Sequence, residues 1–97
     1  MNKKHIGYWY SKWEPEYPRP VENSASSEEI HKMLSVYQHF KNSGREVFCK
    51  GSSICRICGK LNGSSEFVFK NMVVPEGLRH YIVDHRVKVQ DLLDINI

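Results

Sequence analysis

The most regular pattern of apolar positions lies between residues 27 and 42 and predicts an amphipathic helix. Apolar side chains recur there three or four positions apart, which is the spacing of the buried stripe of a helix. The stripe consists of Ile30, Met33, Leu34, Tyr37 and Phe40. Ser26 and Glu29 fit an S-x-x-E capping box before the stripe, and Gly44 fits a stop after it. We therefore expect a helix over 27–42 with its stripe in the core.

Beyond residue 44 the pattern changes to short apolar runs separated by turn residues, which is typical of β-strands. The runs predicted as strands are 46–49, 66–69 and 72–74. Asn62-Gly63 is a pair typical of a tight hairpin turn. Pro75 suits the first turn of a helix, because the backbone N–H that proline lacks has no partner at that position. We therefore expect a second helix over about 75–86.

The N-terminal segment, residues 1–22, is rich in aromatic residues and proline. Five of the eleven aromatic residues and three of the four prolines lie within 6–20. Because proline fixes φ and removes a backbone donor, we expect an extended arm on the surface. The side chains of Tyr8, Trp9 and Trp13 either add to the core or form a platform for a ligand or partner. The small size of the domain favours the core.

The chain of 97 residues has room for a single domain over 1–97. So short a chain buries roughly 65% of its extended-chain surface on folding, which leaves its stability marginal without a metal, disulfides or a partner. No apolar run approaches the ~20 residues that cross a bilayer, and the basic N-terminus lacks the apolar region of a secretory signal. We therefore expect a cytoplasmic protein without a membrane partner.

Two cysteines and two histidines show the spacing of a zinc site. Three cysteines cannot all pair with one another, which argues against a disulfide framework. Cys55 and Cys58 form a C-x2-C, and His80 and His85 form an H-x4-H after a gap of 21 residues, 59–79. The two-residue spacing brings both thiolates to one ion from a tight turn, and two imidazoles complete a Cys2His2 set. We predict that these four residues bind a structural Zn²⁺.

On an undistorted helix His80 and His85 lie about 140° apart, so both reach one ion if the last turn loosens or if the ion lies midway between them. The midway line passes near Gly77, Tyr81 and Asp84. We expect the carboxylate of Asp84 to orient a ligating imidazole, and Gly77 to leave room beside the ion. Cys49 either replaces a histidine as a third thiolate ligand or is a buried free thiol; we favour the free thiol.

This ligand set favours a structural over a catalytic zinc. A catalytic site keeps an open position beside three protein ligands, whereas four ligands close the site. The H-x-E and P-C-x-x-C motifs of zinc deaminases are absent from the sequence. Val83-Asp84-His85 resembles the catalytic strand of HNH endonucleases, but no histidine follows it, so an HNH-like nuclease remnant is a minor alternative. We expect no enzymatic activity and no catalytic residues.

The segment 74–87 has a distinctive sequence, Val-Pro-Glu-Gly-Leu-Arg-His-Tyr-Ile-Val-Asp-His-Arg-Val. It resembles the W-P-E-G-L-x-H-Y-x-x-x-H-x-V segment that closes a group of small, uncharacterised bacterial and phage zinc-binding proteins. Gly7-Tyr8-Trp9 and the C-x2-C match two further features of that group, while Val74 stands where the group has tryptophan. The resemblance implies the same Cys2His2 ligand set and implies no substrate.

Positive charge is concentrated in the half of the chain that holds the cysteines. Residues 41–90 carry nine lysine and arginine residues against four acidic ones, whereas residues 1–40 carry five of each. Such an excess attracts nucleic acid or an acidic protein surface. Arg79 and Arg86 are seven positions apart, so we expect them on one exposed face of the second helix, as in a zinc-finger helix.

Together these patterns predict a small α+β, zinc-finger-like domain that acts as a non-enzymatic binding module. The helix over 27–42 packs on a β-hairpin that carries the zinc-binding turn and on a C-terminal helix, with residues 45–90 forming the zinc module. Interfaces are rich in tryptophan, tyrosine and arginine, so Trp9 and Trp13 favour a protein partner. Nucleic acid bound through basic residues of 41–90 is the alternative, and we expect no small-molecule substrate.

Overall fold

Helix α1 follows the stripe of apolar positions found in the sequence. The computed structural model describes residues 3–49 and 51–96 and places α1 at Ser27–Ser43. Ser26 Oγ accepts a hydrogen bond from the Glu29 N–H at 3.2 Å, and the Glu29 carboxylate accepts one from the Ser26 N–H at 2.9 Å. The predicted helix and its capping box are therefore confirmed, with the C-terminal boundary one residue later.

Four short strands form one mixed sheet. They are β1 (Lys4–His5), β2 (Arg45–Phe48), β3 (Ser65–Phe69) and β4 (Met72–Pro75). Their order across the sheet is β1-β4-β3-β2, with β1 parallel to β4 and the other pairs antiparallel. The three strands expected from the sequence are confirmed within one residue at each end, and so is the α+β class. The parallel strand β1 is an addition, because a strand of two residues is too short to show alternation.

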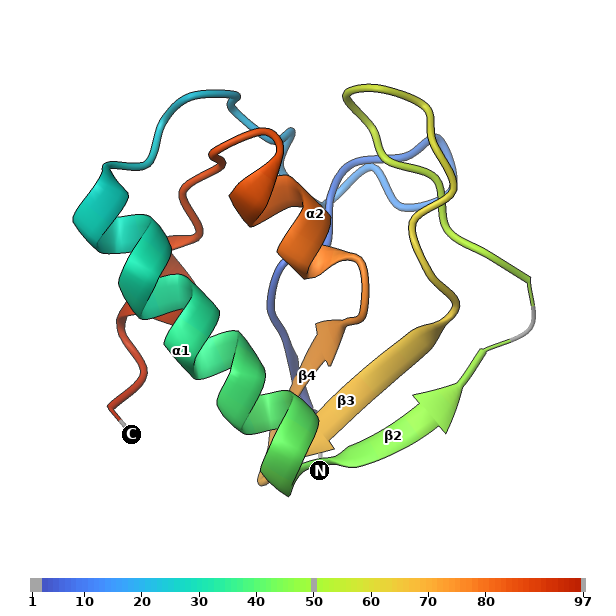
Figure 1. Cartoon of the computed structure of the whole chain (residues 1–97). Helices are drawn as coiled ribbons and strands as arrows, with labels where there is room; N and C mark the ends of the chain where they lie inside the picture. Colours follow the sequence, from blue (N-terminus) through green and yellow to red (C-terminus); the bar gives the residue numbers. More distant parts are fainter. Residues whose placement is uncertain (1–2, 50, 97) are drawn as a thin grey trace.

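The core lies between α1 and the sheet. The two other helices are α2 (Leu78–Val83) and α3 (Gln90–Leu93). Figure 1 shows α1 crossing one face of the sheet, with α2 beside it. Phe40 of α1, Val74 of β4 and Leu92 of α3 are all fully buried in one continuous cluster. No helix in the described part of the chain has the length and apolar content needed to cross a membrane.

The hairpin turn lies at Lys70-Asn71, between β3 and β4, and not at Asn62-Gly63 as predicted. Lys70 closes that turn with a positive φ of 54°. Asn62 and Gly63 instead pair with Ser53, through hydrogen bonds of 2.9 Å from the Asn62 N–H to Ser53 O and from the Ser53 N–H to Gly63 O. Asn62 is buried there, so tertiary packing overrides its local preference for a turn.

The second helix is shorter than predicted at both ends. It spans Leu78–Val83 instead of 75–86, because Pro75 is the last residue of β4. Beyond the helix Arg86 adopts a positive φ of 53°, a conformation that cannot continue an α-helix. Arg86 therefore does not share a helix face with Arg79, and the predicted cationic helix face is not formed.

Residues 3–22 are not a single extended arm, and residues 1–2 of the predicted arm lie outside the described part of the chain. The segment begins with β1, and Ile6 then enters the core with 1% of its surface exposed. A closed loop follows, in which the Tyr10 N–H donates to Pro18 O at 2.8 Å. Pairing with β4 and burial of one aliphatic side chain thus fix the start of the segment against the sheet.

The aromatic side chains of this segment divide between core and surface. Tyr8 is half-buried and donates a hydrogen bond from its hydroxyl to the Glu66 carboxylate. Trp9 packs against the core, with its ring centroid 5.5 Å from that of Tyr81. Trp13 is 81% exposed, so the expectation that it adds to the core is wrong. Its position in the closed loop carries it away from the sheet.

Candidate metal centre

Two cysteines and two histidines from separate parts of the chain converge at one point beside α2. Cys55, Cys58, His80 and His85 each offer one ligand atom, and these four atoms lie within 4.8 Å of one another. Cys55 and His85 are buried, His80 is half-buried and Cys58 is exposed. The fold thus brings together the four residues that the sequence suggested as ligands, and the group has the donors to hold a metal ion.

A hydrogen-bonded loop, the knuckle (residues 53–63), presents the two thiols. Its tight turn is closed by the Gly59 N–H, which donates to Cys55 O at 2.9 Å. Gly59 has a φ of 77°, which glycine adopts without the steric cost that a Cβ would bring. The Arg56 N–H donates to the hydroxyl of Tyr81 at 2.7 Å, so α2 holds the knuckle in place beside the histidines.

His80 lies within α2, whereas His85 lies just beyond its end. The Asp84 N–H donates to His80 O at 2.9 Å and makes the last helical hydrogen bond. Since the chain leaves the helix before His85, the separation of about 140° on an ideal helix no longer applies. The two imidazoles meet edge-on with their centroids 4.9 Å apart. Two arrangements were considered from the sequence. The structure has the one in which the last turn of the helix loosens before His85.

Asp84 fixes the orientation of His80. Asp84 Oδ2 lies 3.0 Å from His80 Nδ1, within one turn of the chain. The other ring nitrogen, His80 Nε2, lies 3.3 Å from Cys58 Sγ. A carboxylate on one nitrogen directs the other toward the cluster, which is how proteins commonly hold a ligating imidazole. The contact between Asp84 and His80 is thus present, and the role of Asp84 toward a bound ion stays a prediction.

Glu22 holds His85 in the same way, from 63 positions away in the sequence. Glu22 Oε2 lies 2.9 Å from His85 Nδ1. The next residues support this contact through the backbone: the Asn23 N–H donates to His85 O at 2.9 Å, and the Ser24 N–H donates to Arg86 O at 3.0 Å. Sequence reasoning missed Glu22 because no local spacing links the proline-rich segment to the second histidine.

The cluster also contains a buried polar atom that lacks a partner. His85 Nε2 makes no hydrogen bond to any described residue. Leaving such an atom unsatisfied costs about 1–3 kcal/mol, and a metal ion at the cluster would satisfy it. Tetrahedral zinc, with bonds of about 2.0–2.3 Å, separates its donor atoms by about 3.3–3.8 Å. The 3.3 Å between Cys58 Sγ and His80 Nε2 falls within that range, and all four donor atoms lie within 4.8 Å of one another, so the group could hold a metal ion.

The electrostatic surroundings favour the thiolate form of Cys58. The backbone N–H of Lys60, followed by the imidazoles of His80 and His85, lowers the pKa of this thiol to about 6. The carboxylate of Glu22, followed by Cys58, raises the pKa of His85. Because the thiolate is the form of cysteine that binds metals, the cluster is suited to a cation at neutral pH.

Cys49 and Gly77 differ from what the sequence led us to expect. Cys49 is a free thiol outside the cluster, but it is exposed and not buried. Partial desolvation and the neighbouring Glu66 carboxylate raise the pKa of Cys49. Gly77 makes room for the knuckle instead of an ion, because a Cβ at this position would lie 2.3 Å from Asn62 O. That close approach seats the knuckle against the start of α2.

Comparison of the chain with protein-family models, with curated proteins and with solved structures gives no match. The resemblance of residues 74–87 to a group of small zinc-binding proteins is therefore not accompanied by a family assignment. The geometry of the side chains alone supports the site, as a Cys2His2 group suited to a metal ion.

Proposed function

We propose that the chain is a non-enzymatic binding module whose fold is held by one structural Zn²⁺ at the Cys2His2 group. The observation that carries this proposal is that the site has four protein donors, which would leave a tetrahedral ion no open position. Four protein donors converge, and a carboxylate already orients each imidazole. Two thiolates with two imidazoles are a donor set typical of zinc. Bound zinc would supply a crosslink between the knuckle, α2 and the turn that follows it.

Two features favour a structural over a catalytic ion. No fifth histidine, cysteine or carboxylate belongs to the cluster within residues 3–49 and 51–96. Catalysis by zinc requires an open position for water or substrate, and the four donors would fill a tetrahedral ion. The neighbouring carboxylates of Glu22 and Asp84 contact imidazole Nδ1 atoms, so neither is free to act as a general base.

The two apolar side chains at the base of the knuckle are largely exposed, which gives the metal a structural task. Ile54 and Leu61 form an isolated β-bridge across it, yet these two side chains are 49% and 77% exposed. Burial of these two side chains therefore contributes little to holding the knuckle closed. Small domains of this kind commonly rely on a metal crosslink, which supports zinc as the stabilising element here.

The exposed apolar side chains favour a protein as the partner. Trp13, Phe48 and Leu61 are each between 77% and 81% exposed. Tryptophan is enriched at protein interfaces and contributes strongly to binding when buried there. Nucleic acid is less favoured, because Arg79 and Arg86 do not form the cationic helix face that phosphate binding would use.

Cobalt substitution tests the closure of the site. We expect one Co²⁺ per chain, with the intense visible absorption of a tetrahedral thiolate site that added azide leaves unchanged, because no position is open to it. Cys49→Ser is the matched control and should give the same spectrum, whereas Cys58→Ser should lose most of the thiolate charge-transfer absorption. A spectrum altered by azide would show an open position and overturn the structural assignment.

Salt dependence tests the class of partner. We expect fluorescence anisotropy with random-sequence 20-mer DNA and RNA to show no saturable binding at 200 mM salt. A nucleic-acid-binding domain would bind at 50 mM salt and lose at least about tenfold in affinity by 200 mM, because each phosphate contact releases a counterion. Saturable binding with that salt dependence would overturn the proposal of a protein partner.

A further inference from the structure

The two thiols of the metal cluster differ in their access to solvent. Cys55 is buried in the core, whereas Cys58 is exposed in the turn of the knuckle. A Cβ on the next residue, Gly59, would have no atom within 4 Å apart from its chain neighbours, so this part of the turn faces open space. His80 is half-buried and His85 is buried. Cys58 is therefore the donor that a small reagent in solution reaches most readily.

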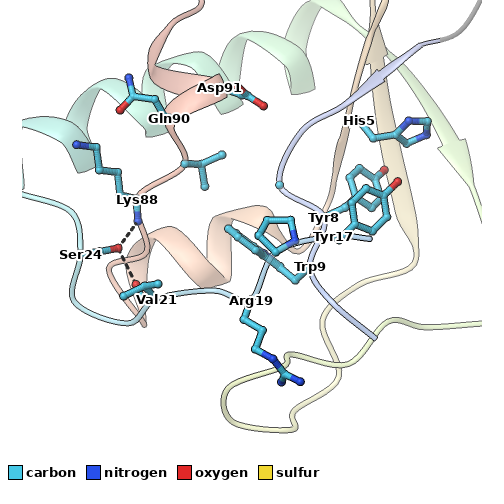
Figure 2. Close-up of a pocket in the computed structure, with 13 residues that line it drawn as sticks. His5, Tyr8, Trp9, Tyr17, Arg19, Val21, Ser24, Lys88, Gln90 and Asp91 are labelled. Carbon is cyan, nitrogen blue, oxygen red and sulfur yellow. Dashed lines mark hydrogen bonds between the residues drawn. The ribbon is translucent and has the colours of Figure 1, made fainter. Parts of the chain in front are cut away.

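A cleft beside the N-terminal segment plays no part in this access. It has a volume of about 580 Å³, and Figure 2 shows the residues that line it, among them Trp9, Arg19 and Lys88. None of the three cysteines of the chain belongs to its wall. A reagent therefore approaches Cys58 from the open surface of the knuckle and not through this cleft.

Cys55 provides the second thiol that a disulfide within the chain requires. Its Sγ lies within 4.8 Å of Cys58 Sγ, and the two residues stand three positions apart in one tight turn. The sulfur atoms of a disulfide lie about 2.05 Å apart, so these two would have to approach by at most about 3 Å. Cys49 is exposed as well, but its thiol is not part of this group. Cys55 is therefore the partner that the fold offers to Cys58.

We propose that Cys58 is a site of oxidation by hydroperoxides, and that a disulfide between Cys58 and Cys55 then forms and releases the bound ion. An accessible thiol beside a second cysteine that resolves its oxidised form is the arrangement typical of redox-sensitive sites. The inference rests on the proposed function, because it concerns the ion that the Cys2His2 group would hold.

The oxidation takes two steps, written here for hydrogen peroxide. In the first, the Cys58 thiolate attacks the O–O bond, so that its sulfur gains an oxygen as a sulfenic acid and hydroxide leaves. In the second, the Cys55 thiolate attacks the Cys58 sulfur, the S–O bond breaks and a second hydroxide leaves. Two protons from solvent convert both hydroxides to water. Two electrons thus pass from the two thiolates to one peroxide, which yields one disulfide and two waters.

The disulfide would remove half of the donors from the site. The thiolate is the form of cysteine that binds metals, and a disulfide holds none. His80 and His85 alone would remain, which is half of a tetrahedral donor set. The ion would then dissociate, and the knuckle would lose its crosslink to α2. Reduction of the disulfide restores both thiolates, so the metal-dependent fold would respond reversibly to peroxide.

The test treats the zinc-loaded protein with hydrogen peroxide and follows zinc release with a chromophoric chelator. We expect the loss of one zinc per chain, in step with the appearance of a peptide that contains Cys55 and Cys58 and is lighter than its reduced form by two hydrogen atoms. Cys49→Ser is the matched control and should release zinc at the same rate, because Cys49 lies outside the cluster. Reduction with a phosphine in the presence of zinc should restore the bound ion.

Three outcomes would overturn the inference. They are retention of zinc in peroxide-treated protein, release of zinc with Cys58 oxidised to a sulfinic acid and no disulfide, and a disulfide that contains Cys49. Each leaves the proposed zinc site untouched, because the zinc content is measured before peroxide is added. Protein that holds no zinc at that earlier stage would instead contradict the proposed function, so the two failures are distinguishable.

Discussion

Cys55→Ser is expected to lose stable metal binding and, with it, the cooperative folding of the domain. The substitution leaves three donors at the site and buries a hydroxyl where the native thiol is 2% exposed. Structural zinc contributes on the order of 10 kcal/mol to the folding of small zinc domains. The free energy of unfolding of an ordinary domain is about 5–15 kcal/mol in total. Losing the metal therefore removes most or all of the free energy of unfolding.

The loss should spread through the whole domain and not stay within the knuckle. Cys55 belongs to the same buried cluster as Phe40 of α1, Leu78 of α2 and Leu92 of α3. The knuckle is also tied to α2 by the hydrogen bond from the Arg56 N–H to the Tyr81 hydroxyl. Because one core joins the helices to the sheet, opening the knuckle exposes apolar surface that α1 and α2 share.

Thermal melts followed by far-UV circular dichroism measure this effect. Wild-type protein with zinc should melt in one cooperative transition, whereas Cys55→Ser, or wild type treated with a strong chelator, should show none. Cys49→Ser is the control for loss of a thiol, since Cys49 is exposed and lies outside the cluster. A melting curve that the chelator leaves unchanged would contradict a structural role for the metal.

The parts of the fold that the sequence predicted are those governed by local patterns. The capping box of Ser26 with Glu29 and the apolar spacing that follows define α1 to within one residue. The strands β2, β3 and β4 follow from short apolar runs. The Cys2His2 set could also be proposed, because the two cysteines lie three positions apart and the two histidines five positions apart, and such short spacings are themselves a signal.

The parts that the sequence did not predict depend on contacts between distant segments. The parallel strand β1 forms only because β4 offers an edge to Lys4 and His5. Asn62 prefers a turn in isolation, yet it is buried and paired with Ser53. Glu22 reaches His85 across 63 positions, and nothing in its neighbours distinguishes it from an ordinary surface glutamate. In each of these three cases a contact between distant segments decides the structure, and local propensity does not.

Glu22→Ala is expected to lower the affinity for zinc by 10- to 100-fold, although Glu22 is not itself a ligand. Its carboxylate lies 2.9 Å from His85 Nδ1 and leaves Nε2 for the cluster. Removal of a partner that orients a ligating imidazole typically has an effect of this size. Glu22→Gln should have an affinity for zinc closer to that of wild type. Its amide oxygen still accepts a hydrogen bond from Nδ1–H, although the negative charge is lost.

Competition with a chromophoric chelator at pH 7 gives these affinities. The matched control is Glu16→Ala, because Glu16 is an exposed glutamate of the same segment.

The Glu22 side chain is 49% exposed, so an ordinary surface ion pair, worth about 0–1 kcal/mol, is the alternative explanation of the contact. Equal affinities in Glu22→Ala and Glu16→Ala would establish that alternative. A loss restricted to Glu22→Ala, with faster amide exchange at Asn23 and Ser24, would mean that metal binding orders the segment following Glu22.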